Sequence, residues 1–188
     1  LKPAREVLAS CVSVNKTKEK FLFYEAKDLN PYKLYIQKAK DGSFVFRQNS
    51  QDPIHDLFLV KVEDDDVYVT YRPNMLGRKN VNKDANRAAD GDKDEIRRAM
   101  PRGKCTMKFT KVSRKEFGDL TEEKMISVLE KAGLYTLEAK SLVNVWKKDF
   151  FETNGTRVIY RLDQKQYDKM FPLEVSETPD SVVRVMLI

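Results

Sequence analysis

TEEKMISVLEKAGLYTLEAKSLVNVWKKDFFETNGTRVIYRLDQKQYDKMFPLEVSETP, residues 121–179, is the stretch that decides the fold. Apolar residues recur there at the three- and four-residue spacing of an amphipathic helix, once on each side of Gly133. Asn154-Gly155 then predicts a left-handed turn, after which the spacing changes to the alternation of a strand, with Val158 and Tyr160 on one face. The stretch therefore predicts a helical hairpin that packs against a sheet.

Capping residues mark the ends of both predicted helices. Asp119, followed by Glu122, predicts the first helix start, because both carboxylates can accept hydrogen bonds from free backbone N–H groups. Gly133 predicts the end of that helix, and Thr136 predicts the cap of the next. Trp146 lies on the apolar stripe of the second helix, and we expect it to be core.

The chain before this stretch consists of short apolar runs separated by turns, as expected for strands. Asp41-Gly42 predicts a hairpin between strands at 32–36 and 43–46. A second hairpin joins residues 57–62 to 67–71, and further strands are predicted at 7–14, 21–24 and 104–112. The fold class is therefore α+β, with an antiparallel sheet or sandwich, a packed helical hairpin and a long charged excursion.

The length of 188 residues suits a single domain, because no polar linker divides two apolar halves. We expect one α+β domain over residues 1–188. Its predicted parts are a sheet from 1–72 and 104–112, a basic loop at 73–103, a helical hairpin at 119–151, and closing segments in 155–188. The closing segments are predicted to include a short helix at 164–170 and a final strand at 182–188.

The net charge of +6 comes mostly from one segment. Residues 72–104 contain ten Lys or Arg and five Asp or Glu, a local charge of +5. Such a segment predicts a contact surface for an acidic protein, an anionic glycan or a nucleic acid. Residues 72–108 contain no aromatic side chain for stacking on bases, which counts against nucleic acid. The candidate binding residues are Arg78, Lys79, Arg97, Arg98, Arg102 and Lys104.

The same segment concentrates oxygen ligands of the kind that calcium prefers. On a twelve-residue calcium loop, Asp84, Asn86, Asp92 and Glu95 take positions one, three, nine and twelve. Ala88 and Ala89 fall where a ligand and the turn glycine belong. We therefore interpret the segment as a solvated mixed-charge loop and keep calcium as the alternative.

Other chemistry has little support in the sequence. His55 is the only histidine, which excludes histidine-rich metal sites, and we expect it to be an exposed turn residue. No nucleotide-binding glycine motif or hydrolase elbow occurs, so we expect no cofactor. Cys11 and Cys105 permit one disulfide, although two small buried thiols is the favoured interpretation. No apolar run approaches the roughly 18 residues that cross a membrane, so no span is expected.

The spacing of particular residues resembles a group of proteins. The matching residues are Trp146, Phe150-Phe151, Gly155, Arg157-Val158, Tyr160, Asp168, Phe171-Pro172-Leu173, Pro179 and Arg184-Val185. This pattern resembles the C-terminal region of uncharacterised bacterial proteins that are mostly large and apparently exported. Residues 21–24 and 57–62 resemble the upstream sheet of the same group, whereas Asp163 and Leu187-Ile188 depart from the pattern. The resemblance implies a bacterial, envelope-facing or periplasmic module and transfers no activity or site.

Three functions follow in order of preference. The first is a non-enzymatic interaction or structural module of a larger bacterial protein, which contacts a protein partner or its parent protein's other domains through the basic loop. The second is a domain that binds nucleic acid or another polyanion. The third is an enzyme that uses carboxylates alone, although no spacing singles out a catalytic pair.

Overall fold

The computed structural model describes residues 12–14, 16–19, 34–77, 103–174, 176 and 179–188. Its strands and helices are, in chain order, β1 (Val12–Val14), β2 (Thr17–Glu19), β3 (Leu34–Lys38), β4 (Phe44–Gln48), β5 (Ile54–Glu63), β6 (Asp66–Met75), β7 (Lys104–Met107), β8 (Lys111–Val112), α2 (Arg114–Gly118), η3 (Asp119–Glu123), α3 (Lys124–Lys131), α4 (Thr136–Lys147), η4 (Lys148–Glu152), β9 (Gly155–Leu162), α5 (Gln164–Met170) and β10 (Met186–Leu187). The segments η3 and η4 are π-helical turns that continue neighbouring α-helices.

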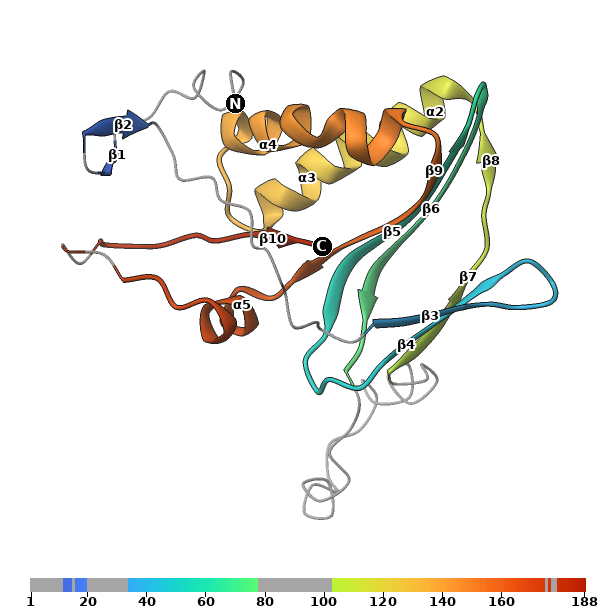
Figure 1. Cartoon of the computed structure of the whole chain (residues 1–188), viewed down its shortest axis with the longest axis horizontal. Coiled ribbons are helices and arrows are strands. Elements are labelled where there is room, and N and C mark those ends of the chain that lie inside the picture. The colour runs from blue at the N-terminus through green and yellow to red at the C-terminus, as the bar shows by residue number, and fades with distance from the viewer. Residues whose placement is uncertain (1–11, 15, 20–33, 78–102, 175, 177–178) are drawn as a thin grey trace, which may run out of the picture.

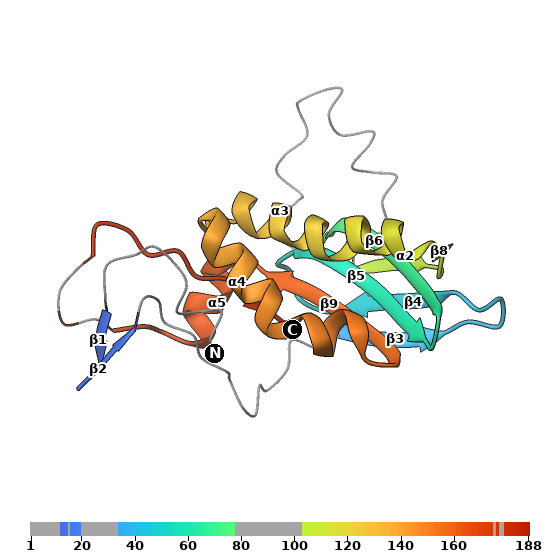
Figure 2. The same ribbon diagram turned by 90° about the horizontal axis from the view of Figure 1, so that it is seen from above.

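These elements form three layers. The middle layer is a five-stranded sheet with the order β10-β9-β5-β6-β8. Helices α3 and α4 cover one of its faces, and the three-stranded sheet β3-β4-β7 lies on the other side (Figure 1). Figure 2 shows the two helices lying over the sheet when the molecule is seen from above. All strand pairs in these two sheets are antiparallel, so the predicted α+β fold is confirmed.

Strand β5 belongs to both hydrophobic cores. Phe58, Val60 and Val62 pack toward the helices, whereas Leu57 and Leu59 pack toward the three-stranded sheet. All five side chains are at most 1% exposed. Because alternate residues of a strand point to opposite faces, a strand between two layers must be apolar at every position. This explains the uninterrupted apolar run at residues 57–60.

A β-bulge interrupts β5 at Asp56. The register between β5 and β9 shifts between His55 and Phe58, and Asp56 adopts a left-handed backbone with φ of 52°. The shift places Ile54 on the same side as Leu57, three residues later, instead of on the opposite side. Such a bulge inserts one residue and redirects the side chains around it. Here it points a carboxylate into a position that regular alternation would give to an apolar residue.

The helical layer begins before the predicted start at Asp119. Ser113 caps α2, because its Oγ accepts the N–H of Glu116 at 3.2 Å while the Glu116 carboxylate accepts the N–H of Ser113 at 2.9 Å. The chain then remains helical through Asp119 and into α3, so the prediction of Asp119 as a cap is wrong. The reciprocal Ser113–Glu116 pair already satisfies the N–H groups at the start.

The helical hairpin itself is confirmed. Gly133 follows the end of α3 with φ of 108°, a conformation that favours glycine. Thr136 is the first residue of α4 and not its cap. The cap position belongs to Tyr135, whose N–H donates to the Glu138 carboxylate at 2.8 Å. Met125, Leu129 and other apolar residues of the hairpin are buried against the sheet.

The two predicted turns that reverse the chain are present. Gly42 has φ of 80° in the turn between β3 and β4, where Asp41 accepts hydrogen bonds from the backbone and hydroxyl of Ser43. Gly155 has φ of 132° at the first residue of β9. The Asn154 side chain exchanges two hydrogen bonds with Asp64, which joins the β5–β6 turn to the neighbouring start of β9.

Several predicted boundaries change. The final strand is only β10, because residues 182–185 are not paired in a ladder. Strand β6 continues to Met75, inside the predicted basic loop at 73–103. The predicted helix at 164–170 is confirmed as α5. The predicted strand at 21–24, most of the one at 7–14 and most of the predicted loop, residues 78–102, lie outside the described residues.

Candidate functional site

The structure places one of the six predicted binding residues. Lys104 is the first residue of β7, and its side chain is exposed. Arg78, Lys79, Arg97, Arg98 and Arg102 lie outside the described residues, as do the predicted calcium ligands Asp84, Asn86, Asp92 and Glu95. Within the described ranges, no group of three or more His, Cys, Asp or Glu side chains has the arrangement of a metal site.

Gln48 fastens both ends of the basic segment, residues 72–104, to β4. The backbone N–H of Gln48 donates to the carbonyl of Gly103 at 2.9 Å. Its side-chain Nε2 donates to the carbonyls of Met75 at 2.9 Å and Leu76 at 3.1 Å. The N–H of Gly103 in turn donates to the Leu76 carbonyl at 2.9 Å. Leu76 and Gly103 are therefore held together beside the three-stranded sheet, although 26 residues separate them in the chain.

The outer face of the three-stranded sheet carries a row of three exposed side chains. Tyr35 of β3 is opposite Arg47 of β4, and Arg47 is opposite Lys104 of β7. Tyr35 is 51% exposed, and both cations are exposed. Neighbours in an antiparallel sheet have Cβ atoms about 5 Å apart, so the ring and the two charges form one surface. We call this row, Tyr35, Arg47 and Lys104, the basic row.

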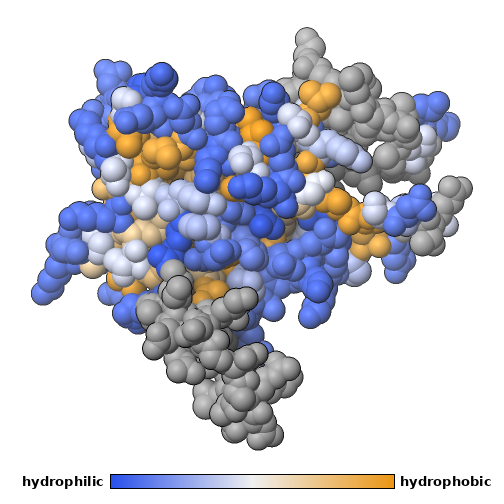
Figure 3. Space-filling model, turned by 180° about the vertical axis from the view of Figure 1, so that it is seen from behind, coloured by the Kyte–Doolittle hydropathy of each residue, from blue (hydrophilic) through white to orange (hydrophobic). Residues whose placement is uncertain are grey.

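The surroundings of the basic row are also positively charged. Strands β3, β4 and β7 and their nearest connections, residues 34–48 and 103–108, contain five cations, Lys38, Lys40, Arg47, Lys104 and Lys108, and one acid, Asp41. Hydrogen bonds from Ser43 lower the pKa of Asp41, with a smaller contribution from the charge of Lys108. No described carboxylate forms an ion pair with Arg47, Lys104 or Lys108. In Figure 3, the end of the β3–β4 hairpin at the left edge is largely hydrophilic.

His55 is not the exposed turn residue that we expected. It lies in β5, where its Nδ1 is 2.8 Å from Oδ1 of Asn74 on β6 and its Nε2 is 3.9 Å from Oδ2 of Asp163. The proline at residue 53 led to the prediction of a turn, but the strand begins directly after it. His55 thus forms a hydrogen bond with Asn74 across the sheet, and Asp163, the cap of α5, lies close to its other ring nitrogen.

A polar cluster that the sequence did not reveal surrounds the bulge. The Asp56 carboxylate accepts the hydroxyl of Tyr71 at 2.8 Å and forms an ion pair with Nε of Arg161 at 2.9 Å. Burial, followed by the hydrogen bond to Asp56, raises the pKa of Tyr71 well above its usual value. The ammonium of Lys124 lies 4.7 Å from the Tyr71 ring centroid. Tyr71 is 15 residues and Arg161 is 105 residues from Asp56 in the chain. The only sign of this cluster in the sequence is that the alternation of the strand breaks after Ile54.

Two further predictions concern buried residues. Trp146 is only partly buried, and its ring stacks on that of Phe150 with the centroids 5.6 Å apart. The prediction that Trp146 belongs to the core is therefore wrong. The buried apolar residues of α4 are Ala139 and Val143. Cys105 is a free, buried thiol, and burial raises its pKa. Its possible partner Cys11 lies outside the described residues.

No protein-family model, curated protein sequence or solved structure matches this chain. The resemblance to exported bacterial proteins therefore stays a prediction. Among the helices of the described part, none combines the length and apolar character needed to cross a membrane.

Proposed function

We propose that this chain is a non-enzymatic interaction module of a larger bacterial protein, and that the basic row and the basic segment contact an acidic partner protein. The assignment to a larger, envelope-facing protein rests on the sequence resemblance. The assignment of the surface rests on charge and position. The proposal involves no cofactor.

The observation that carries the proposal is the position of Arg47 and Lys104. Both cations are exposed, neither has a described carboxylate partner, and they are neighbours across β4 and β7. The Gln48 hydrogen bonds hold Met75, Leu76 and Gly103 together, and the sequence between them, residues 78–102, contains eight cations and five acids. Unpaired charges of one sign, concentrated at one place, attract a partner of the opposite sign and accelerate its association.

A second candidate function is the binding of single-stranded nucleic acid, and one observation favours it. The basic segment lacks aromatic residues, but strand pairing brings the half-exposed ring of Tyr35 beside Arg47 and Lys104. A ring that stacks on a base next to cations that contact phosphates is the usual basis of single-strand binding on a sheet. Tyr and Arg are also the residues most enriched at protein–protein hot spots, so the row alone fits both partners.

Fluorescence anisotropy with two labelled probes tests the proposal. Poly-glutamate represents an acidic polypeptide, and single-stranded oligothymidylate represents a nucleic acid. We expect both probes to bind at low salt, because charge dominates both contacts. The double substitution Arg47→Glu and Lys104→Glu should weaken poly-glutamate binding about tenfold. Lys140→Glu, which reverses an exposed cation on α4, is the matched control and should have little effect.

Tyr35→Ala separates the two candidate functions. Stacking on a base contributes about 1–3 kcal/mol, so loss of the ring should weaken oligothymidylate binding at least fivefold if nucleic acid is the partner. The same substitution should leave poly-glutamate binding within about twofold of the unsubstituted protein if the contact is only ionic. The proposal is refuted if neither probe binds, or if the double substitution has no larger effect than Lys140→Glu.

A further inference from the structure

A groove lies where the two sheets separate, on the other side of the β3–β4 hairpin from the basic row. The side chains of β5 that face the three-stranded sheet are, in order, Leu57, Leu59 and Lys61. The two leucines are fully buried, whereas the side chain of Lys61 is 27% exposed. The apolar core therefore ends at Lys61. Beyond it the sheets enclose an open groove of about 300 Å³, within the range of small-molecule sites.

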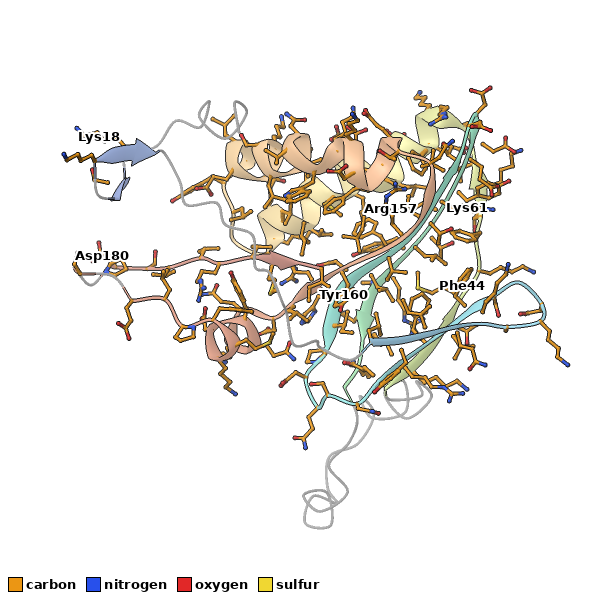
Figure 4. The ribbon with its side chains drawn as sticks, viewed as in Figure 1. Lys18, Phe44, Lys61, Arg157, Tyr160 and Asp180 are labelled. Atoms are coloured by element: carbon orange, nitrogen blue, oxygen red, sulfur yellow. The ribbon has the colours of Figure 1, made fainter. Side chains whose placement is uncertain are left out.

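The floor of the groove is a row across the five-stranded sheet. Thr156 of β9 is opposite Lys61 of β5, and Lys61 is opposite Tyr68 of β6. Phe44 of β4 forms the opposite wall, together with Lys38 and Gly42 of the same hairpin. Figure 4 shows Phe44 and Lys61 on opposite sides of the space between the two sheets.

Three aromatic rings give the groove an apolar lining. Phe109 follows β7 and links the two sides: its ring centroid lies 5.3 Å from that of Phe44 and 6.0 Å from that of Tyr68. The Phe44 and Phe109 rings meet edge to face, with 75° between their planes. Rings in this arrangement present both faces and edges, which suits contact with another planar ring.

Among the described residues, the charged side chains that line the groove are two lysines, Lys38 and Lys61. Lys61 lies over the rings of Tyr68 and Phe109, with Nζ 5.2 Å and 5.8 Å from their centroids, and it also pairs with Glu63 at 2.6 Å. Lys38 is exposed and has no ion-pair partner among the described residues. None of the aspartates and glutamates in the described part of the chain lines the groove. A cationic ligand would be repelled, whereas an anionic group can pair with Lys38.

We propose that this groove binds a small planar aromatic anion, such as an aromatic carboxylate. The ring of the ligand packs among Phe44, Tyr68 and Phe109, and its anionic group contacts the ammonium of Lys38. The charge of Lys61 is balanced by Glu63, so Lys38 is the lining cation that is left to pair with the ligand. This site is separate from the basic row, because Lys38 and Phe44 face the groove while Arg47 and Tyr35 face outward.

Titration followed by two-dimensional NMR tests the proposal with three probes. Indole-3-acetate supplies both the ring and the charge, indole-3-acetamide supplies the ring alone, and acetate supplies the charge alone. We expect indole-3-acetate to shift the backbone resonances of Phe44, Lys61 and Tyr68 with a Kd on the order of 1 mM or lower. The amide should bind more weakly, and acetate should not saturate.

Two variants and a control define the site. Lys38→Gln should weaken indole-3-acetate binding about two- to fivefold and abolish the preference over the amide. Phe109→Leu should weaken the acid and the amide alike, because it removes a ring and not a charge. Lys40→Gln, an exposed cation on the same hairpin that does not line the groove, is the control. Equal binding of acid and amide by the unsubstituted protein, or resonance shifts spread outside the groove, would overturn the proposal.

The outcome is independent of the proposed function. The substitutions Arg47→Glu and Lys104→Glu should leave indole-3-acetate binding unchanged, since neither residue lines the groove. If they abolish it, the proposal of a separate site is wrong. Failure of indole-3-acetate to bind would leave the poly-glutamate result unaffected. Failure of poly-glutamate to bind would likewise leave the indole-3-acetate result unaffected.

Discussion

Removal of the Asp56 carboxylate tests whether the bulge cluster holds the sheet together. In Asp56→Ala, Arg161 loses its ion-pair partner and Tyr71 loses its hydrogen-bond acceptor. Removing one partner of a fully buried pair costs about 3–5 kcal/mol, because the remaining charge is left without compensation. The side chains of Arg161 and Asp56 are 18% and 11% exposed, so water compensates part of this loss. We therefore expect the free energy of unfolding to fall by about 3 kcal/mol.

The backbone at residue 56 gives this prediction a second test. Asp56 has φ of 52°, and alanine tolerates this conformation worse than glycine by about 1 kcal/mol. Asp56→Gly should therefore be about 1 kcal/mol less destabilising than Asp56→Ala, although both variants lack the carboxylate. Asp65→Ala removes an exposed carboxylate from the β5–β6 turn and should change stability by less than about 0.5 kcal/mol.

Urea unfolding measures these differences, and fluorescence of the single tryptophan on α4 supplies the signal. A double-mutant cycle with Arg161→Met isolates the pair, for which we expect a coupling free energy of at least about 1.5 kcal/mol. A coupling below about 0.5 kcal/mol would show that Asp56 and Arg161 are merely adjacent. Equal destabilisation by alanine and glycine would refute the contribution of the backbone conformation.

Three more predictions concern stability. Gln48→Leu removes both side-chain hydrogen bonds to the buried Met75 and Leu76 carbonyls, and urea unfolding should show a loss of about 2–3 kcal/mol, against almost none for the exposed Gln51→Leu. In Gly77→Ala the new Cβ would lie 1.8 Å from the Gln51 carbonyl oxygen, so the melting temperature should fall. In Gly118→Ala the new Cβ meets no atom within 4 Å and the backbone is helical, so the melting temperature should rise. Because the pKa of Tyr71 is raised by folding, its stabilising effect is complete below pH 10 and declines at higher pH by at most about 1.4 kcal/mol per pH unit. Between pH 10 and 11, stability should therefore fall less steeply in Tyr71→Phe, and identical slopes would contradict this assignment.

Much of the fold could be predicted from local sequence. The apolar spacing on both sides of Gly133 predicted the helical hairpin, because a stripe of apolar side chains has to be buried against something. Asp41-Gly42 and Asn154-Gly155 predicted two chain reversals, because only residues that tolerate positive φ fit there. The helix start at Ser113 was within reach of the sequence as well, since Ser113 and Glu116 have the same capping-box spacing as Asp119 and Glu122.

The candidate sites depended on contacts between distant residues. The Asp41-Gly42 signal put the β3–β4 hairpin of the basic row within reach of the sequence, although a two-residue loop would pair Tyr35 with Gln48 and the observed three-residue loop, 40–42, pairs it with Arg47. The neighbouring position of Lys104 was not, because β7 follows a segment whose length gives no register. The sequence likewise showed Phe44, Lys61 and Phe109 only as apolar or charged members of separate strands.

Sequence alone determined the α+β class, the helical hairpin and the concentration of positive charge between residues 72 and 104, since all three depend on neighbouring residues. Only the tertiary structure decided which face each strand presents. The bulge at Asp56 shows the physical reason: one inserted residue reverses the two faces of a strand, and it joins Asp56 to Arg161, 105 residues away. Gln48 also brings distant residues together, in the three-stranded sheet. Its hydrogen bonds hold both ends of the basic segment beside the basic row.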